Sequence, residues 1–386
     1  MGRPLRLLMV SYEFPPLGGG TGNAVFHVLR ELARISDAEI DLLTSERRDA
    51  PPDGAGEDPA APESVTVHRV RIAKSARHRW TAREIALWTA GALRAARRLA
   101  REDRYDLCHC WSGWPSGLVG YSIRRRVPYL VALRGSDVPG YNPRLRLLDP
   151  LVFGRVARAV WCGTRASTCV SRSLAELARR TDPAFSAEMI GNGVDARRFH
   201  PGERSPRFTV LYVGRLIERK GLGDLVEAFA SVRTKMESAR LEIVGEGPER
   251  ERLGRIVRRL GVEESVAFRG ALDGVELEAV YRRASVFVLT AHAEAMSNAA
   301  LEAMASGLPL VTTPTGTAEI LDGNGIVVEP GAPSSIARAL LRYVDDEEIR
   351  RRHGLRSRAI AETLTWEKTA CEYLNLYDRI VGDSRK

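Results

Sequence analysis

Residues 285–312, SVFVLTAHAEAMSNAALEAMASGLPLVT, contain the pattern that decides the fold. The apolar, β-branched run over 285–290 is typical of a buried parallel strand, and Ser297 or Asn298 can cap the helix that follows it. A Ser-Gly-Leu-Pro turn then leads into a second apolar run at 310–312. A strand, a helix and a second strand in this order indicate an α/β unit of an open parallel sheet.

Two glutamates occupy this unit where such sheets bind ligands. Glu294 falls in the loop between strand and helix, and Glu302 lies about one turn into the helix. The backbone N–H groups of Met296, Ser297 and Asn298 would point into the same space, at a helix N-terminus suited to anions. Surface charge alone gives such a spacing by chance, but the apolar strand and the lysine-free loop favour a site that binds hydroxyls beside an anion.

The remaining sequence repeats this strand-helix alternation in two halves. The length of 386 residues also exceeds one ordinary core. The first half predicts strands at 5–11, 40–44, 65–72, 105–110 and 128–133, with helices at 23–35 and 81–102 and an aperiodic loop over 45–64. The second half predicts strands at 208–213, 241–244, 266–269 and 325–328, with helices at 222–232, 249–260 and 275–283. We therefore expect two Rossmann-like, doubly wound domains, 1–200 and 207–365, joined by the linker 201–206 around a cleft.

Composition and cysteine usage narrow the class of protein. A hydrophobic content of 44% with 34 glycines and 20 prolines is globular. No signal-peptide core and no apolar run near the ~18 residues of a membrane span is evident, so we expect a cytoplasmic protein. The five cysteines lack paired spacing and are predicted to be reduced, buried thiols. In Cys108-His109-Cys110, neighbouring side chains on a strand point to opposite faces and cannot share one metal ion.

Positive charge is concentrated in one segment of the first half. The chain carries a net charge of +9, and residues 65–104 alone hold 11 Lys+Arg against 3 Asp+Glu, or 11 − 3 = +8. At helical spacing, an apolar face (Ile85, Trp88, Ala92, Ala96, Leu99) opposes a basic face (Arg83, Arg94, Arg97, Arg98, Arg101). The basic face is either solvated or, together with Arg69, Arg71, Lys74, Arg77, Arg79 and Trp80, a surface for anionic lipid head groups. Nucleic acid is not expected, because no aromatic platform is interleaved with these cations.

Two further motifs follow strands and suit phosphates. Gly18, Gly19 and Gly20 come after the first strand, where glycine backbones can approach a phosphate closely or simply make a tight turn. In the second half, Arg215 and Lys220 follow the strand at 208–213 and form either a diphosphate-binding pair or solvated loop residues. Their place at the carboxyl end of a parallel strand favours the ligand-binding interpretation.

Several motifs in order give the chain a family resemblance over nearly its whole length. They are Gly18-Gly19-Gly20, Gly191-Asn-Gly-Val-Asp195 with Phe199 and Pro201, Val213-Gly-Arg-Leu216 with Lys220-Gly221, Val244-Gly-Glu-Gly-Pro248, Phe268-Arg-Gly270, the Glu294/Glu302 pair and Glu319. With this set the chain resembles the retaining GT-B glycosyltransferases of family 4. The resemblance implies a hexosyltransferase that moves a sugar from a UDP- or GDP-sugar to a hydroxyl acceptor, such as a lipid-linked or cell-envelope glycan.

The resemblance also implies roles for individual residues. Glu302 would hold the ribose hydroxyls, Glu294 and the amides of 296–298 the donor sugar, and Arg215 with Lys220 the diphosphate. The glycine loop, residues 18–20, would close over that diphosphate. The final helix, 366–386, would cross back to the first domain. Neither a cofactor nor a metal is expected, because Arg215 and Lys220 supply positive charge.

One departure from the family pattern concerns the acceptor side. Many members carry His-x-His after the fourth strand of the first domain, whereas Asp106-Leu-Cys-His109-Cys-Trp111 has tryptophan at the second position. His109, Trp111 and Asp137 are the acceptor-side candidates. Two alternatives to sugar transfer remain open at this point: a nucleotide-sugar 2-epimerase that needs no acceptor, and a nucleotide-sugar-binding protein without activity.

Overall fold

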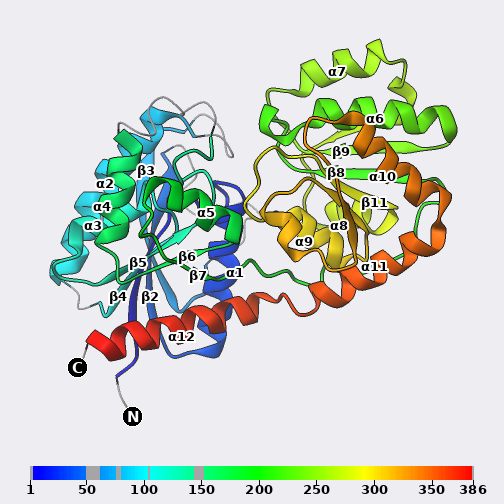
Figure 1. Cartoon of the computed structure of the whole chain (residues 1–386). Coiled ribbons are helices and arrows are strands. Elements are labelled where there is room, and N and C mark those ends of the chain that lie inside the picture. The colour runs from blue at the N-terminus through cyan, green and yellow to red at the C-terminus, as the bar shows by residue number, and fades with distance from the viewer. Residues whose placement is uncertain (1–2, 49–60, 75–79, 103–104, 143–151, 385–386) are drawn as a thin grey trace. The chain divides into compact units, whose positions relative to one another are not determined.

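A computed structural model describes residues 3–48, 61–74, 80–102, 105–142 and 152–384 (Figure 1). The chain forms two compact units. Unit 1 comprises Met1–Asn192 and Trp366–Lys386, and unit 2 comprises Gly193–Thr365. The first unit thus ends at Asn192, ahead of the predicted linker at 201–206, and the C-terminal segment belongs to it.

Unit 1 is built on a seven-stranded parallel sheet in the order β3-β2-β1-β4-β5-β6-β7. The strands are β1 Arg6–Val10, β2 Glu39–Arg47, β3 Val65–Ile72, β4 Leu107–Cys110, β5 Tyr129–Leu133, β6 Ala166–Cys169 and β7 Glu188–Met189. The helices are α1 Gly20–Ile35, α2 Ala82–Glu102, α3 Ser116–Ile123, α4 Gly154–Cys162 and α5 Arg172–Thr181. The first five strands and two helices confirm the sequence predictions, although the predicted loop over 45–64 was wrong at its start, because β2 continues to Arg47. Residues 49–60 of that loop lie outside the described part of the chain.

Unit 2 has a six-stranded parallel sheet in the order β10-β9-β8-β11-β12-β13. The strands are β8 Thr209–Val213, β9 Arg240–Val244, β10 Val266–Gly270, β11 Val286–Leu289, β12 Leu310–Thr312 and β13 Gly325–Val327. The helices are α6 Leu222–Lys235, α7 Arg250–Arg259, α8 Gly274–Arg283, α9 Asn298–Ala305, α10 Pro333–Asp345 and α11 Glu347–Ala361. α10 packs against α6 and α11 against α9, so both faces of the sheet carry helices (Figure 1). These elements confirm the doubly wound α/β fold predicted for the second half.

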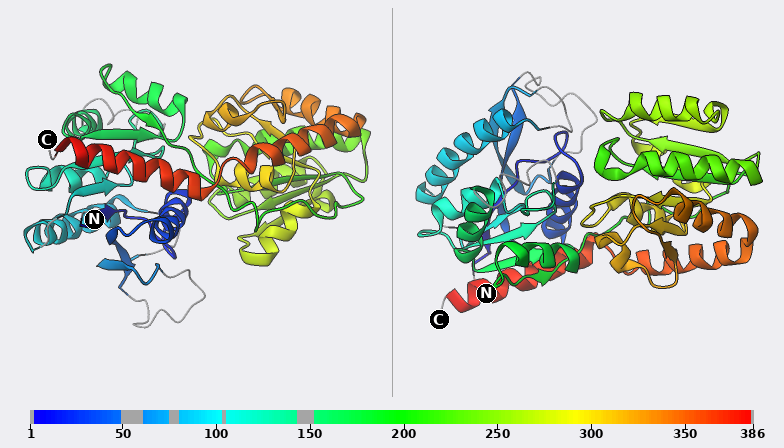
Figure 2. Two further views of the ribbon diagram at one scale, coloured as in Figure 1. Left: turned by 90° about the horizontal axis from the view of Figure 1, so that it is seen from below. Right: turned by 45° about the horizontal axis from the view of Figure 1, so that its top comes forward.

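The last helix, α12 (Trp366–Ser384), packs in unit 1 against α1 and lies along that unit in Figure 2. The Trp366 ring stacks on the His27 ring of α1, with centroids 4.9 Å apart and planes 4° from parallel. Tyr373 and Tyr377 are fully buried in the core of unit 1. The apolar stripe of α12 is therefore part of the first core, although it follows unit 2 in the chain. No helix among the described residues is long and apolar enough to cross a membrane.

Candidate active site

The loops after β8 and β9 in unit 2 are joined by backbone hydrogen bonds and pack closely against each other at glycines. The Gly214 N–H donates to Val244 O at 3.0 Å, and the Leu216 N–H donates to Glu246 O at 2.8 Å. Gly245 and Gly247 have φ values of 127° and 157°, and a Cβ added to them would lie 2.0 Å and 2.2 Å from carbonyl oxygens of the neighbouring loop. Such contacts exclude any side chain. The glycines of the Val-Gly-Glu-Gly motif therefore fix the backbone on which the exposed Arg215 stands.

Lys220 is anchored at the end of a short 3-10 turn, Glu218–Lys220. Gly221 follows in the left-handed region at φ 63°, and a Cβ there would lie 2.3 Å from Thr290 O. The Thr290 hydroxyl in turn donates to Lys220 O at 3.0 Å and Gly221 O at 3.1 Å. These hydrogen bonds hold Lys220, whose side chain is largely buried, against the carboxyl end of β11.

Glu294 and Lys220 form an ion pair through Glu294 Oε2 and Lys220 Nζ. Burial alone would raise the pKa of Glu294, but the charge and hydrogen bond of Lys220, with the charges of Arg219 and Arg215, hold that pKa below its usual value. The Gly316 N–H donates to Glu294 O at 2.9 Å and fixes its backbone. The structure therefore joins two predicted site residues as a charged pair at the carboxyl ends of β8 and β11.

Glu302 has a different environment on α9. Its Oε2 accepts a hydrogen bond from the Tyr281 hydroxyl of α8 at 2.8 Å. Burial raises the pKa of Glu302, and the Tyr281 hydrogen bond and the Arg198 charge offset part of that rise. Tyr281 is fully buried and was not predicted as a site residue. The available signal was a tyrosine on the apolar stripe of α8, which also carries Leu277 and Val280, since a buried phenol requires a hydrogen-bond partner.

The amides at the start of α9 match the prediction only in part. Ser297 caps the helix, because its hydroxyl accepts from the Ala300 N–H at 3.3 Å. Its own N–H donates to Thr317 Oγ1 at 3.1 Å. The expectation that the Ser297 N–H faces a ligand was therefore wrong, since a protein hydroxyl already accepts that proton. Binding through the amides of Met296 and Asn298 remains a prediction.

In unit 1 the glycine loop leads directly into α1, which begins at Gly20 and not at the predicted residue 23. Gly18 has φ 112°, and a Cβ there would lie 2.5 Å from Glu13 Cβ. The Gly19 N–H donates to Glu13 Oε2 at 3.2 Å. An internal carboxylate thus contacts the loop at the N-terminus of α1, where a helix favours negative charge.

His109 and Trp111 lie in the interior of unit 1. Both are fully buried, and their rings stack with centroids 4.4 Å apart. His109 Nδ1 is 2.7 Å from the Tyr377 hydroxyl, and Tyr373 packs against both rings. Burial, and secondly the charge of Arg134, hold the pKa of His109 well below its usual value. α12 covers the face on which these two rings lie, and their assignment to the acceptor side stays a prediction.

The Asp137 carboxylate accepts hydrogen bonds from backbone N–H groups of two loops. It accepts from the N–H groups of Gly113 at 2.6 Å, Gly135 at 2.7 Å and Arg134 at 3.0 Å. Burial raises the pKa of Asp137, and these N–H groups offset part of the rise. The carboxylate therefore ties together the loops after β4 and β5, and its contact with an acceptor stays a prediction.

The basic segment divides into buried and exposed residues. On α2, Trp88, Ala92, Ala96 and Leu99 are buried, whereas Arg83, Arg94, Arg97, Arg98 and Arg101 are exposed, as predicted. Lys74 is not part of the exposed surface, because it pairs with Glu84 at 3.6 Å and its Nζ lies 3.9 Å from the centroid of the Trp80 ring. Arg69 and Arg71 both pair with Glu46. Arg77 and Arg79 lie outside the described residues.

The described part of the chain holds no cluster of side chains suited to a metal ion. No three His, Cys, Asp or Glu side chains gather there in a way that could hold a metal ion. Cys108 and Cys110 have sulfur atoms 3.8 Å apart on one face of β4, while the His109 ring lies on the other. All five cysteines are free, but Cys162 and Cys371 are exposed, so the prediction that the thiols are buried was wrong for those two.

Comparison with solved structures gives the fold. Sucrose-phosphate synthase from Thermosynechococcus elongatus superimposes with a TM-score of 0.84 at 22% identity, over 98% of this chain and 100% of its own. The Anabaena protein HepE, solved with UDP-glucose, gives a TM-score of 0.72 at 18% identity over 96% of this chain and 99% of its own. The fold is that of the GT-B enzymes, two α/β units each with a parallel sheet.

Sequence comparisons give the family. The model described as Glycosyltransferase Family 4 matches residues 18–198, and that described as Glycosyl transferases group 1 matches 207–346. The chain is 29% identical over 405 residues to a glycogen synthase of Mycobacterium tuberculosis, covering 97% of this chain and 94% of the relative. It is 28% identical over 435 residues to a D-inositol 3-phosphate glycosyltransferase of Salinispora arenicola, covering 98% and 93%. The chain belongs to the group 1 glycosyltransferases and is a glycosyltransferase of the GT-B type.

Proposed function

We propose that the protein transfers a sugar, with retention of anomeric configuration, from a nucleoside-diphosphate sugar to a hydroxyl acceptor. The observation that carries this proposal is the arrangement in unit 2 of a cation-paired Glu294 and a hydroxyl-bonded Glu302 at the ligand-binding edge of the sheet. The neighbour HepE, solved with UDP-glucose, supports a nucleotide sugar as the donor.

Glu302 is proposed to hold the ribose. A carboxylate accepts hydrogen bonds from two vicinal hydroxyls, and the Tyr281 hydroxyl already uses one of its acceptor sites. Tyr281 fixes the orientation of the carboxylate before the donor arrives, so less freedom is lost on binding. Glu302 forms no ion pair with any residue that the structure describes, so it offers negative charge to hydroxyl donors without competition from a salt bridge there.

Arg215 and Lys220 are proposed to bind the diphosphate. Arg215 is exposed on a rigid loop, and Lys220 is held at the end of β11 by Thr290 and Glu294. As the bond between C1 and the diphosphate oxygen breaks, negative charge grows on the leaving group, and both cations stabilise it more in the transition state than in the ground state. These two cations account for the charge stabilisation, so the reaction is proposed to need no metal.

The acceptor hydroxyl is proposed to attack C1 from the face that the diphosphate leaves. Its oxygen forms the new bond to C1, and its proton passes to the departing phosphate oxygen, so no protein nucleophile is required. Glu294 stays ionised through its pairing with Lys220 and is proposed to accept a hydrogen bond from a hydroxyl of the transferred sugar. The protein contributes position and electrostatic stabilisation.

A donor screen tests this proposal. A panel of UDP-, GDP- and ADP-sugars is examined by thermal shift, because a bound donor raises the unfolding temperature by mass action. The substitution Glu302→Ala should abolish the shift, whereas the matched control Glu276→Ala, an exposed glutamate on α8, should keep it. Unchanged donor affinity in Glu302→Ala would contradict the site assignment. NMR of the donor alone separates transfer from 2-epimerisation, which yields an isomer without an acceptor.

The arginine face of α2 is proposed to contact anionic lipid at the inner surface of the cell membrane. Its five arginines are exposed and oppose a buried apolar face.

Liposome pelleting should require anionic lipid and weaken at high salt, because surface charges are screened. The substitutions Arg94→Ala, Arg97→Ala and Arg98→Ala together should reduce pelleting. Arg255→Ala, Arg258→Ala and Arg259→Ala on α7 remove the same charge and should not. Binding independent of lipid charge would refute this surface.

A further inference from the structure

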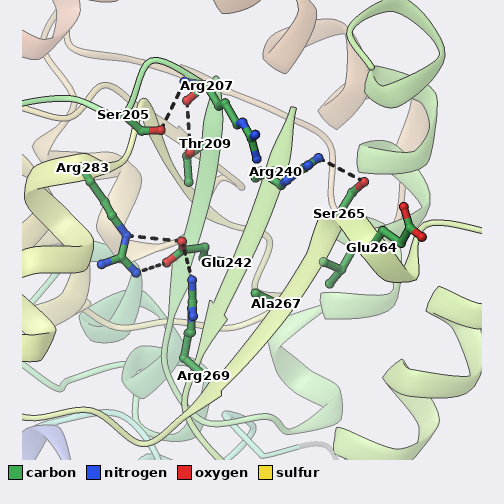
Figure 3. A pocket seen from close by; sticks show the side chains of 11 residues that line it. Ser205, Arg207, Thr209, Arg240, Glu242, Glu264, Ser265, Ala267, Arg269 and Arg283 are labelled. Atoms are coloured by element: carbon green, nitrogen blue, oxygen red, sulfur yellow. Dashed lines mark hydrogen bonds and ion pairs between the residues drawn. The ribbon is translucent and has the colours of Figure 1, made fainter. Parts of the chain in front are cut away.

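Unit 2 contains a cavity of about 300 Å³ that none of the site residues above lines. It lies on the polar face of β8, β9 and β10, and includes the first residues of those strands, Thr209, Arg240 and Val266 (Figure 3). Arg215 and Glu294, by contrast, follow the opposite, carboxyl ends of β8 and β11. The cavity is therefore separate from the proposed donor site.

The cavity is polar because of how side chains alternate along β9. Leu241 and Ile243 point into the core and are fully buried, so Arg240 and Glu242 point to the other face. In the register of the sheet Glu242 lies opposite Ala267 of β10, and Arg269, two residues further on, projects on that same face. An α/β sheet normally covers such a face with apolar side chains. Here it carries charged ones.

A buried carboxylate organises two of the arginines. Glu242 accepts two hydrogen bonds from Arg283, at 2.6 Å and 3.3 Å, and one from Arg269 at 3.0 Å, and the bonds meet at Glu242 in Figure 3. Glu242 is only 8% exposed, whereas the side chains of Arg269 and Arg283 are 45% and 36% exposed. One carboxylate cannot neutralise two guanidinium groups, and each guanidinium has five N–H donors, so both cations keep donors for another partner.

Two more arginines enlarge the positive charge. Arg240 lies beside Ser265, to whose hydroxyl it donates at 3.4 Å, and Arg207 stands exposed at the start of β8. Four arginines and two glutamates, Glu242 and Glu264, line the cavity, which gives 4 − 2 = +2. The hydroxyls of Ser205, Thr209 and Ser265 also line it. Planar guanidinium forks with hydroxyls match the tetrahedral oxygens of a phosphate.

We propose that this cavity is a second anion site, which binds a phosphate group, either free or on a small phosphorylated molecule. A cavity of about 300 Å³ is at the lower end of the range for small-molecule sites, which favours a single phosphate with a small substituent. Glu242 holds Arg269 and Arg283 in place before the ligand arrives, and Arg207 and Arg240, which also line the cavity, supply further N–H donors.

The test uses inorganic phosphate and glycerol 3-phosphate as probes, titrated calorimetrically at constant ionic strength maintained with chloride. The full chain carries Arg215→Ala, Lys220→Ala and Glu294→Ala, so that the proposed diphosphate site is inactive and no unpaired carboxylate is left at position 294. We expect saturable binding at one equivalent, weakened at least about tenfold by adding Arg207→Ala and Arg240→Ala, because charge-assisted hydrogen bonds are lost. Tighter binding of glycerol 3-phosphate assigns an ester, and tighter binding of phosphate assigns the free ion.

The matched control adds Arg255→Ala and Arg258→Ala on α7, which remove the same charge elsewhere in unit 2. Phosphate affinity should stay unchanged in this control. Arg207 and Arg240 do not pair with Glu242, so their removal leaves that ion cluster intact, and thermal unfolding checks the fold of each variant. Absence of saturable binding, or an equal loss in the control, would overturn the proposal.

Discussion

The substitution Tyr281→Phe isolates one hydrogen bond of the proposed ribose contact. Phenylalanine keeps the ring that packs in the core and removes only the hydroxyl that lies 2.8 Å from Glu302 Oε2. A hydrogen bond to a charged group contributes about 1.5–3 kcal/mol, so donor affinity should fall by roughly 10- to 100-fold if the carboxylate loses its orientation. The unfolding free energy should change less, because the buried ring is retained.

The pH dependence of donor binding gives a second measurement of the same hydrogen bond. The Tyr281 hydrogen bond stabilises the ionised form of Glu302 and lowers a pKa that burial raises. Removing it raises that pKa further, so donor binding in Tyr281→Phe should be lost at a higher pH than in the wild type as the solution is acidified. Calorimetric titration of donor between pH 5 and pH 8 measures this. An unchanged acid limb with unchanged affinity would refute the positioning role of Tyr281.

Four further predictions concern the same unit. Lys220→Ala leaves Glu294 buried and unpaired, so urea unfolding should show a loss of about 3–5 kcal/mol, and adding Glu294→Ala should recover stability but not activity. The pKa of Glu294 is depressed in the folded state, so the ionised carboxylate stabilises the wild type relative to Glu294→Gln. This difference in unfolding free energy should be present above the unfolded-state pKa and should disappear as the pH falls through the folded-state pKa. Gly247→Ala places a Cβ 2.2 Å from Leu216 O and should lower both the unfolding temperature and donor affinity. An unfolding temperature and a donor affinity equal to those of the wild type would contradict the close packing of the loops after β8 and β9. Treatment with EDTA should leave the rate within about twofold, since two cations supply charge on the leaving group; a loss restored by a divalent ion would exclude a metal-free reaction.

The sequence predicted the strands that have regular apolar patterns. β1 to β5 and β8 to β13 lie where the alternation of strand and helix signals placed them. β6, Ala166–Cys169, was missed because it is short and contains Ser167 and Thr168, and β7 was missed because both of its residues are exposed. Local pattern identifies a strand where β-branched or apolar side chains recur, as in the partly exposed β3, and the short, hydroxyl-rich β6 has no such run.

For the candidate site, residue type and position along a strand were sufficient in unit 2 but not in unit 1. Lys220 and Glu294 meet because both follow neighbouring parallel strands, which a sequence can indicate. The positions of His109 and Trp111 depend on α12, which arrives from the far end of the chain to cover them. The bond between Tyr281 and Glu302 likewise joins two helices whose contact no local pattern specifies.

A nucleoside-diphosphate sugar is proposed to react with retention in a site held by Glu302 and Lys220. The most direct test is to supply an α-linked donor and to follow by ¹H NMR the anomeric configuration of the first sugar product, formed on an acceptor or on water. Retention predicts an α product with release of the nucleoside diphosphate, and loss of both in Glu302→Ala. A β product formed at the outset would contradict it.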